Sequence, residues 1–219
     1  MKAPAQLRVD IVSDVVCPWC AIGYKQLECA IGEMGDRVEV GVRWHPFQLA
    51  PYLGDDGQSI ADYGRERYGA TPEQSAANRT RIQSAGAPLG IEFNYSPNSR
   101  IYNTRKAHRL LTWAGETGGQ TALKLALFRA YFTEQRNISD DAVLLDVVES
   151  AGLDRAAAAV ALNDPRYEEE VAQEVQYWEM QNITGVPAFI INGKYMIPGA
   201  QDADTFVRVI EKVLEKEAA

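Results

Sequence analysis

Two cysteines separated by two residues are the part of this sequence best equipped for chemistry. They form Cys17-Pro18-Trp19-Cys20, which follows an alternating apolar stretch and opens an amphipathic one. Where such a pair begins a helix, its sulfurs can meet at bonding distance, and the free amides and dipole of the helix start stabilise a thiolate. A stabilised thiolate is populated near neutral pH and leaves readily. The spacing therefore predicts a pair that cycles between dithiol and disulfide.

The two thiols are expected to have different roles. At about 100° per residue, Cys20 falls on the apolar face of the helix. That face also carries Gly23, Tyr24, Leu27, Ile31 and Met34. Cys17 precedes the first turn, so we expect it to be exposed at the rim, with a pKa below that of a free thiol. This arrangement predicts that Cys17 attacks substrates and Cys20 resolves the mixed disulfide, while Pro18 and Trp19 tune the pair and contact substrate.

Two simpler interpretations of the motif are a zinc site and unrelated packing cysteines. A structural zinc site needs four ligands, and the remaining candidates, Cys29, His45 and His108, have no paired spacing. The strand–CxxC–helix context favours redox chemistry, and we expect no metal. Cys29 is interpreted as a bystander, with a secondary redox site as the alternative. The two histidines are interpreted as ordinary strand-end or surface residues.

A second motif lies near the other end of the chain, in Thr184-Gly185-Val186-Pro187-Ala188. A proline is tolerated at the first residue of a strand, where it is usually trans. Beside a CxxC pair, we expect instead that Pro187 is cis and packs near the sulfurs. Val186 would then offer its backbone groups to an extended substrate peptide by strand addition.

Charged residues near these motifs have both functional and structural interpretations. Asp10 and Asp14 precede Cys17 by seven and three residues. Either carboxylate could accept the Cys20 proton as a positioned base, but solvation at a strand end is the expected role of both. A local basic cluster is read as a solvated helix face, with an anion site as the alternative. It comprises Arg100, Arg105, Lys106 and Arg109.

The elements needed to position these motifs can be read from the hydrophobic pattern. Alternation predicts strands over 7–13, 37–44, 188–192 and 194–197, and Asn192-Gly193 predicts a hairpin between the last two. Helices are expected over 18–35 and 202–217. Between the two pairs of strands, the pattern predicts helices over 101–116, 122–134, 140–150, 155–162 and 166–181. Thr71-Pro72-Glu73-Gln74 predicts a further helix start, and Ser139 and Asp154 are expected caps.

This order predicts one α/β domain interrupted by a helical insertion. The strands near both ends would form a single sheet from residues 1–54 and 183–219, and residues 55–182 would form the inserted helical domain. Two independent domains explain the pattern less well, because neither end would make a sheet alone.

Composition limits the possible functions further. The chain has 219 residues, 46% of them hydrophobic, and a net charge of −8. That charge disfavours nucleic acid and anionic membrane surfaces as partners. No apolar run reaches the roughly 18 residues of a membrane span, and the first ten residues carry no signal-peptide core. We therefore expect a cytoplasmic protein.

The motifs together resemble the thioredoxin superfamily, and within it the DsbA-like oxidoreductases of the FrnE-like branch. The resemblance is carried by the Cys17–Cys20 motif with the following Ala21-Ile22-Gly23, by 185–189, and by 195–201. It implies a thioredoxin-like fold with a large helical insertion, a Cys17/Cys20 redox cycle and a cis proline at Pro187. It implies no bound cofactor, thiol- or disulfide-containing protein or small-molecule substrates, and glutathione as a candidate co-substrate.

The leading functional hypothesis is a thiol-disulfide oxidoreductase or disulfide isomerase. One alternative is a glutathione-dependent isomerase or transferase, similar to kappa-class enzymes or 2-hydroxychromene-2-carboxylate isomerases. Such enzymes typically replace the first cysteine by serine, whereas this chain keeps both. A second alternative is a binding protein whose cysteines are incidental.

Overall fold

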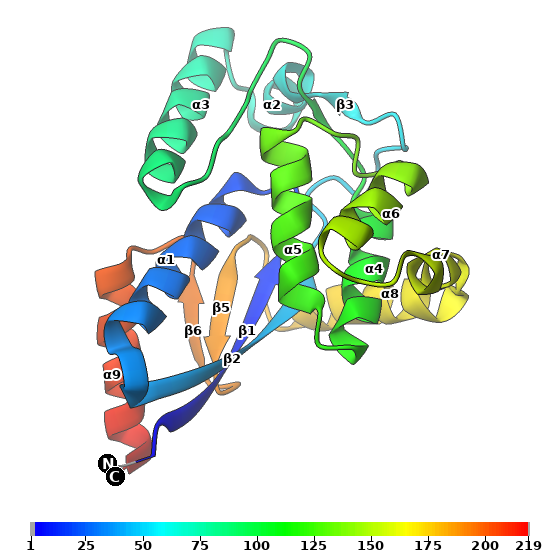
Figure 1. The fold of residues 1–219 in the computed structure, drawn as a ribbon. Coiled ribbons are helices and arrows are strands. Elements are labelled where there is room, and N and C mark those ends of the chain that lie inside the picture. The colour runs from blue at the N-terminus through cyan, green and yellow to red at the C-terminus, as the bar shows by residue number, and fades with distance from the viewer. Residues whose placement is uncertain (1–2, 219) are drawn as a thin grey trace.

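The computed structural model describes residues 3–218 and places strands from both ends of the chain in one sheet. The strands are β1 (Ala5–Ser13), β2 (Val38–Pro46), β5 (Ala188–Ile191) and β6 (Tyr195–Pro198), in the order β2-β1-β5-β6. The β1–β2 pair is parallel, whereas β5 is antiparallel to both β1 and β6 (Figure 1). The prediction of one sheet built from both ends of the chain, with a large helical insertion, is confirmed.

Strand β1 is one of the two central strands of the sheet, and a short loop connects it to the Cys17–Cys20 motif. Its Ile11 is fully buried between Trp44 of β2 and Phe189 of β5. The β5–β6 hairpin turns at Asn192 and Gly193, whose φ values are +51° and +68°. Both values suit the type I′ turn that this dipeptide predicts.

Helix α1 (Pro18–Met34) carries the motif and packs beside α9 (Ala203–Ala218), as Figure 1 shows. Cys17 is the N-cap of α1 and Pro18 its first residue, where a proline costs no hydrogen bond. Gly23 lets the helix approach the sheet closely, because a Cβ there would lie 3.0 Å from the Phe189 ring.

The segment between β2 and β5 contains most of the helices. They are α2 (Ile60–Tyr68), α3 (Pro72–Gly86), α4 (Arg105–Glu116), α5 (Gln120–Phe128), α6 (Asp141–Ser150), α7 (Arg155–Asn163) and α8 (Pro165–Met180). Two short strands, β3 (Gln58–Ser59) and β4 (Arg100–Ile101), form a separate antiparallel pair. Thr71 closes the predicted capping box with Gln74 at the start of α3.

Several predicted boundaries within this segment are wrong. Helix α4 begins at Arg105 rather than at residue 101, because Ile101 pairs with Gln58 in the short sheet. The helix predicted to end at 134 changes at Arg129 into a π-helical turn. Ser139 does not cap α6: its hydroxyl donates to the Asn103 carbonyl, and the Asp140 side chain accepts the capping bond.

The apolar core crosses from the sheet into the helical segment without a break. One buried cluster includes Val9 and Ile11 from β1 together with Leu110 from α4 and Leu127 from α5. Within residues 3–218, none of the helices combines the length and apolar character that crossing a bilayer requires.

Candidate active site

Both motif cysteines are free thiols at the start of α1. The backbone N–H of Cys17 donates to the Asp14 carbonyl at 3.2 Å, and that of Cys20 donates to the Cys17 carbonyl at 3.1 Å. Cys20 is fully buried, as its helical face predicts. The expectation that Cys17 is exposed at the rim is wrong, because only 4% of it reaches solvent. The helices that follow β2 cover the motif.

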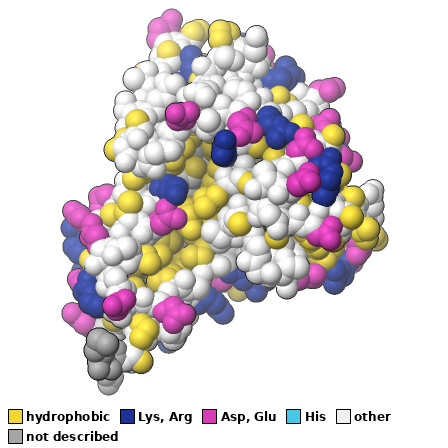
Figure 2. Space-filling view, viewed as in Figure 1, with side chains coloured by type: hydrophobic (Ala, Val, Ile, Leu, Met, Phe, Trp, Pro, Cys, Tyr) yellow, Lys and Arg dark blue, Asp and Glu magenta, His cyan; other side chains and the backbone are white. Residues whose placement is uncertain are grey.

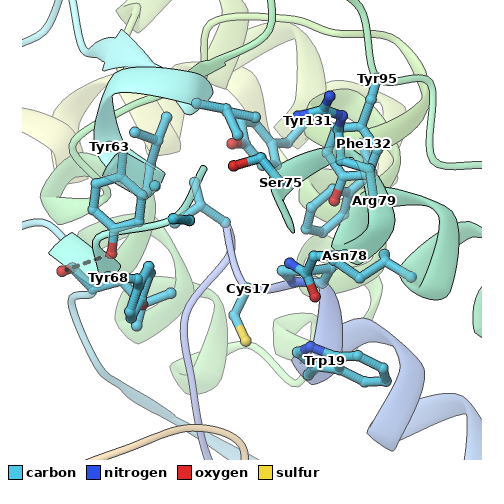
Figure 3. Close-up of a pocket in the computed structure, with 18 of the residues that line it drawn as sticks. Cys17, Trp19, Tyr63, Tyr68, Ser75, Asn78, Arg79, Tyr95, Tyr131 and Phe132 are labelled. Atoms are coloured by element: carbon cyan, nitrogen blue, oxygen red, sulfur yellow. Dashed lines mark hydrogen bonds between the residues drawn. The ribbon is translucent and has the colours of Figure 1, made fainter. Parts of the chain in front are cut away.

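A cavity of about 640 Å³ explains how Cys17 can still react. Cys17, Pro18 and Trp19 line it, together with Val186, whereas Cys20 does not. Its other walls come from α2, α3 and the π-helical turn, as Figure 3 shows for Tyr63, Tyr68, Ser75, Asn78, Arg79, Tyr131 and Phe132. On the face shown in Figure 2, apolar side chains gather between α1 and α5. Cys17 is therefore the sulfur that an entering molecule meets.

The second motif meets the first across this cavity. The Cys17 Sγ lies 3.7 Å from the Val186 carbonyl oxygen, to which the thiol can donate. The Val186–Pro187 peptide bond is cis, and Pro187 is buried at the start of β5. Val186 and Pro187 also line a second, open groove of about 380 Å³ beside β6.

The two thiols differ in acidity, and in the opposite sense to the sequence prediction. The hydrogen bond with Cys20, followed by burial, raises the pKa of Cys17. Burial also acts to raise the pKa of Cys20, but the hydrogen bond from Cys17 and the charge of Lys124 outweigh it and lower that pKa. A lowered pKa at Cys17 was therefore the wrong expectation for the reduced pair, whose thiolate is favoured at Cys20.

A buried polar layer lies beneath the motif. Asp14 is fully buried: its Oδ2 accepts the backbone N–H of Leu49 at 2.8 Å, and its Oδ1 lies 3.3 Å from Nε2 of His108. That Nε2 also lies 2.9 Å from the Phe47 carbonyl oxygen and so must carry the hydrogen, because a carbonyl only accepts. The expectations of a surface His108 and a solvated Asp14 are wrong, since α4 packs His108 against the loop before Cys17.

A second polar cluster lies at the outer strand. His45 is buried between Asp10 and Glu174, with Nε2 at 3.0 Å from Asp10 Oδ1 and Nδ1 at 2.9 Å from Glu174 Oε2. Arg8 pairs with Asp10, and Arg43 pairs with Glu174. Asp10 is thus buried and paired rather than solvated, and His45 connects the sheet to α8.

Lys124 is the functional candidate that sequence reasoning missed. It lies on α5 and is fully buried, although lysine is rarely buried without a partner. The sequence does contain a signal: Lys124 begins an i, i+3, i+4, i+7 stripe whose other members are Leu127, Phe128 and Tyr131. A cation at the head of an otherwise apolar stripe must either reach solvent or serve a buried site.

The remaining candidates lie away from the cavity. Cys29 is exposed on the outer side of α1. Lys106 pairs with Asp55 and Asp141, and Arg109 pairs with Glu168, so these cations are engaged by carboxylates. Arg100 donates to the backbone carbonyls of Asp56 and Gly57.

Comparison with known proteins places this architecture in a family. The model of the DSBA-like thioredoxin domain matches residues 8–211. A relative in Bacillus subtilis, the uncharacterized protein YwbO, is 32% identical over 96% of this chain and 99% of its own length.

Solved structures agree with this assignment. A probable DsbA oxidoreductase from Streptomyces coelicolor is 31% identical, with a TM-score of 0.89 over 95% of this chain and 90% of its own. The cytosolic disulfide reductase DsbM from Pseudomonas aeruginosa, solved with GSH, shares the fold at 17% identity, with a TM-score of 0.66 over 95% and 99% of the two chains. The chain therefore belongs to the DsbA-like thioredoxin family, a family of thiol:disulfide oxidoreductases.

Proposed function

We propose that this protein is a thiol-disulfide oxidoreductase that uses Cys17 as the attacking thiol and Cys20 as the resolving thiol. The observation that carries the proposal is access: Cys17 lines the 640 Å³ cavity and Cys20 does not. The two thiols interact, which lowers the pKa of Cys20 and raises that of Cys17. Transfer of one proton from Cys17 to Cys20 puts the charge on the accessible sulfur.

The reaction then follows two balanced exchanges. The Cys17 thiolate attacks a substrate disulfide, forms a mixed disulfide and releases one substrate thiolate. The Cys20 thiolate next attacks the Cys17 sulfur, which forms the Cys17–Cys20 disulfide and releases the second substrate thiolate. The substrate gains the two electrons that the dithiol loses, and the reverse sequence oxidises a substrate dithiol.

The cavity suits a small thiol or disulfide, and we propose glutathione or a similar anionic thiol as co-substrate. Its volume lies within the range of small-molecule sites, and its walls combine aromatic and aliphatic side chains with a few polar ones. Arg79 contributes a cation to this wall. The backbone of Val186 beside Cys17 would hold the extended part of the substrate, and Pro18 and Trp19 would contact it.

Trapping of mixed disulfides tests the assignment of the two thiols. Cys20→Ser should form covalent adducts with glutathione disulfide or a disulfide-containing protein, because it can attack but cannot resolve. Cys17→Ser should form no adducts and should no longer catalyse the reduction of insulin by dithiothreitol. Intact mass and non-reducing electrophoresis measure the adducts, with Cys29→Ser as the control for the exposed third thiol.

The pattern of adducts decides between the alternatives. Adducts on Cys17→Ser alone would reverse the roles. Full function of both variants without adducts would reject the dithiol cycle. A protein that conjugates glutathione to electrophiles but reduces no disulfide would be an isomerase or transferase instead.

A further inference from the structure

The side chain of Lys124 is an ammonium group enclosed in the protein with no hydrogen-bonding partner. It is fully buried, and within residues 3–218 its Nζ has no hydrogen bond. The Nζ lies 5.2 Å from the centroid of the Trp44 ring and 5.1 Å from that of Phe128. Two aromatic faces offset part of the lost hydration, but a desolvated cation at this depth still needs a reason to be there.

The surroundings of Lys124 point to the redox pair. Trp44 also contacts Tyr24, at 4.9 Å between ring centroids, and Tyr24 lies one helical turn after Cys20 on the same face of α1. Burial lowers the pKa of Lys124, and the negative charges of Cys20, Asp14 and Cys17 act against that effect. The charge of Lys124 in turn favours the thiolate of Cys20.

We propose that Lys124 is a positioning residue for the proposed redox cycle: its buried ammonium stabilises the thiolate of Cys20. The inference rests on the proposed function only for its use in turnover, since the electrostatic effect on Cys20 needs no substrate. The insertion thus contributes one charge to a site whose sulfurs belong to the thioredoxin-like part.

The effect belongs to the resolving step. Once the mixed disulfide has formed on Cys17, Cys20 must lose its proton before its sulfur can attack that of Cys17. The ammonium of Lys124 favours the deprotonated form, the Cys17–Cys20 bond forms, and the bond to the substrate sulfur breaks. In the reduced protein the same charge stabilises the thiolate and so makes the pair more oxidising.

The titration of Lys124 sets the pH range over which this effect operates. Burial lowers its pKa to about 8. The titratable groups around Lys124 include Cys17 and Cys20 of the motif and Asp14, which follows β1. They also include His45 of β2 and His108 of α4, which line the same small cavity as Lys124. The ammonium is present at neutral pH and its effect on Cys20 disappears as the pH rises through 8.

Direct titration of each thiol tests the proposal without any substrate. In a Cys17→Ser, Cys29→Ser background the thiolate absorbance near 240 nm reports Cys20 alone. Adding Lys124→Met should raise the pKa of Cys20 by about one pH unit. In a Cys20→Ser, Cys29→Ser background, the same change should move the pKa of Cys17 less. Leu127→Met, a volume-conserving change one turn along α5, should move neither.

Two functional readouts follow from the same substitution. The dithiol–disulfide equilibrium of Lys124→Met in glutathione buffers should shift about tenfold toward the disulfide, or about 30 mV for a two-electron couple. Resolution of a preformed Cys17 adduct should slow about threefold at pH 7, because the loss of thiolate is partly offset by greater nucleophilicity. The slower rate should recover as the pH rises above 8.

Each result either supports or overturns the role of Lys124. An unchanged Cys20 pKa in folded Lys124→Met rejects the proposal, as does a rate defect that persists at high pH. Loss of the native fold in Lys124→Met, judged by circular dichroism, also rejects it, because the residue would then be structural. If the Cys20 pKa shifts while Cys20→Ser traps no adduct, the electrostatic inference stands and the proposed function fails.

Discussion

The buried ammonium of Lys124 is expected to lower the stability of the protein, although we propose that it stabilises the thiolate of Cys20. Burial depresses its pKa from 10.5 to about 8. The folded state therefore disfavours the charged form of Lys124. The resulting loss in the free energy of unfolding is complete below pH 8 and decreases as the pH rises to 10.5. At about 1.36 kcal/mol per pH unit, this depression corresponds to roughly 3 kcal/mol.

Lys124→Met should accordingly raise the free energy of unfolding at pH 7 by up to about 3 kcal/mol. Urea denaturation at pH 7 and pH 10 measures the gain, which should shrink at the higher pH. Leu127→Met, on the same helix, should change stability by less than about 1.5 kcal/mol at either pH. A loss of stability in Lys124→Met would show that its ammonium has a stabilising partner.

The local part of the site can be predicted from the sequence, and the part built by tertiary contacts cannot. Cys17 and Cys20 are recognised because their spacing and the helix start are both local. Lys124 and His108 approach the motif from α5 and α4, about a hundred residues away in the chain, so no spacing rule connects them to it. The prediction for Cys17 is wrong because its interaction with Cys20 and its burial both raise its pKa, and the burial depends on tertiary contacts.

At the scale of elements, α3 forms the roof of the active-site cavity. Ser75, Asn78 and Arg79 of this helix line the cavity, and Arg81 lies over the indole of Trp19, with 4.8 Å between its Cζ and the ring centroid. The cation–π contact therefore connects the roof to the motif itself. Because Arg81 is exposed, its contribution is expected to be about 0.5–1 kcal/mol.

Arg81→Ala should loosen α3 and open the cavity. Amide exchange in α3 should become about two- to fivefold faster if it proceeds through local opening, and alkylation of Cys17 should accelerate with it. Hydrogen-exchange mass spectrometry and iodoacetamide labelling measure the two effects. Arg67→Ala, an exposed arginine of α2, is the matched control. Unchanged labelling in Arg81→Ala would mean that other contacts hold the roof.

Strong local signals predicted the elements well, whereas short elements escaped prediction. The start of α3 was predictable because Thr71 and Gln74 satisfy each other's backbone groups within four residues. Strands β3 and β4 have two residues each, which is too short for a visible alternation. Ile101 pairs with Gln58 in this short sheet, and α4 therefore starts later than its apolar pattern suggests.

At the scale of the whole molecule, the sheet and the insertion share one core and are joined by buried polar contacts. The boundaries of the discontinuous domain at 54/55 and 182/183 stay a prediction, but the apolar cluster crosses them. One such link is His45, which bonds Asp10 of β1 on one side and Glu174 of α8 on the other. Its ring also contacts Trp178 of α8, with 4.8 Å between centroids.

Glu174→Ala should weaken this link and reduce the stability of the entire chain. Removing the carboxylate leaves Nδ1 of the buried His45 without its partner, which costs about 1–3 kcal/mol. Because the core is continuous, we expect one cooperative urea transition in both proteins, with a lower midpoint and an unchanged slope in the variant. Tryptophan fluorescence, to which the nearby Trp178 contributes, and far-ultraviolet circular dichroism should report the same midpoint.

The control for this prediction lies on the same helix. Glu179 is exposed, so Glu179→Ala should change the free energy of unfolding by less than about 0.5 kcal/mol. If Glu174→Ala instead separates the two signals into distinct transitions, the helical segment unfolds on its own, and His45 is what couples it to the sheet. If the midpoint does not move, the paired carboxylate of Asp10 suffices for His45, and other contacts, the continuous apolar core among them, hold the two parts together.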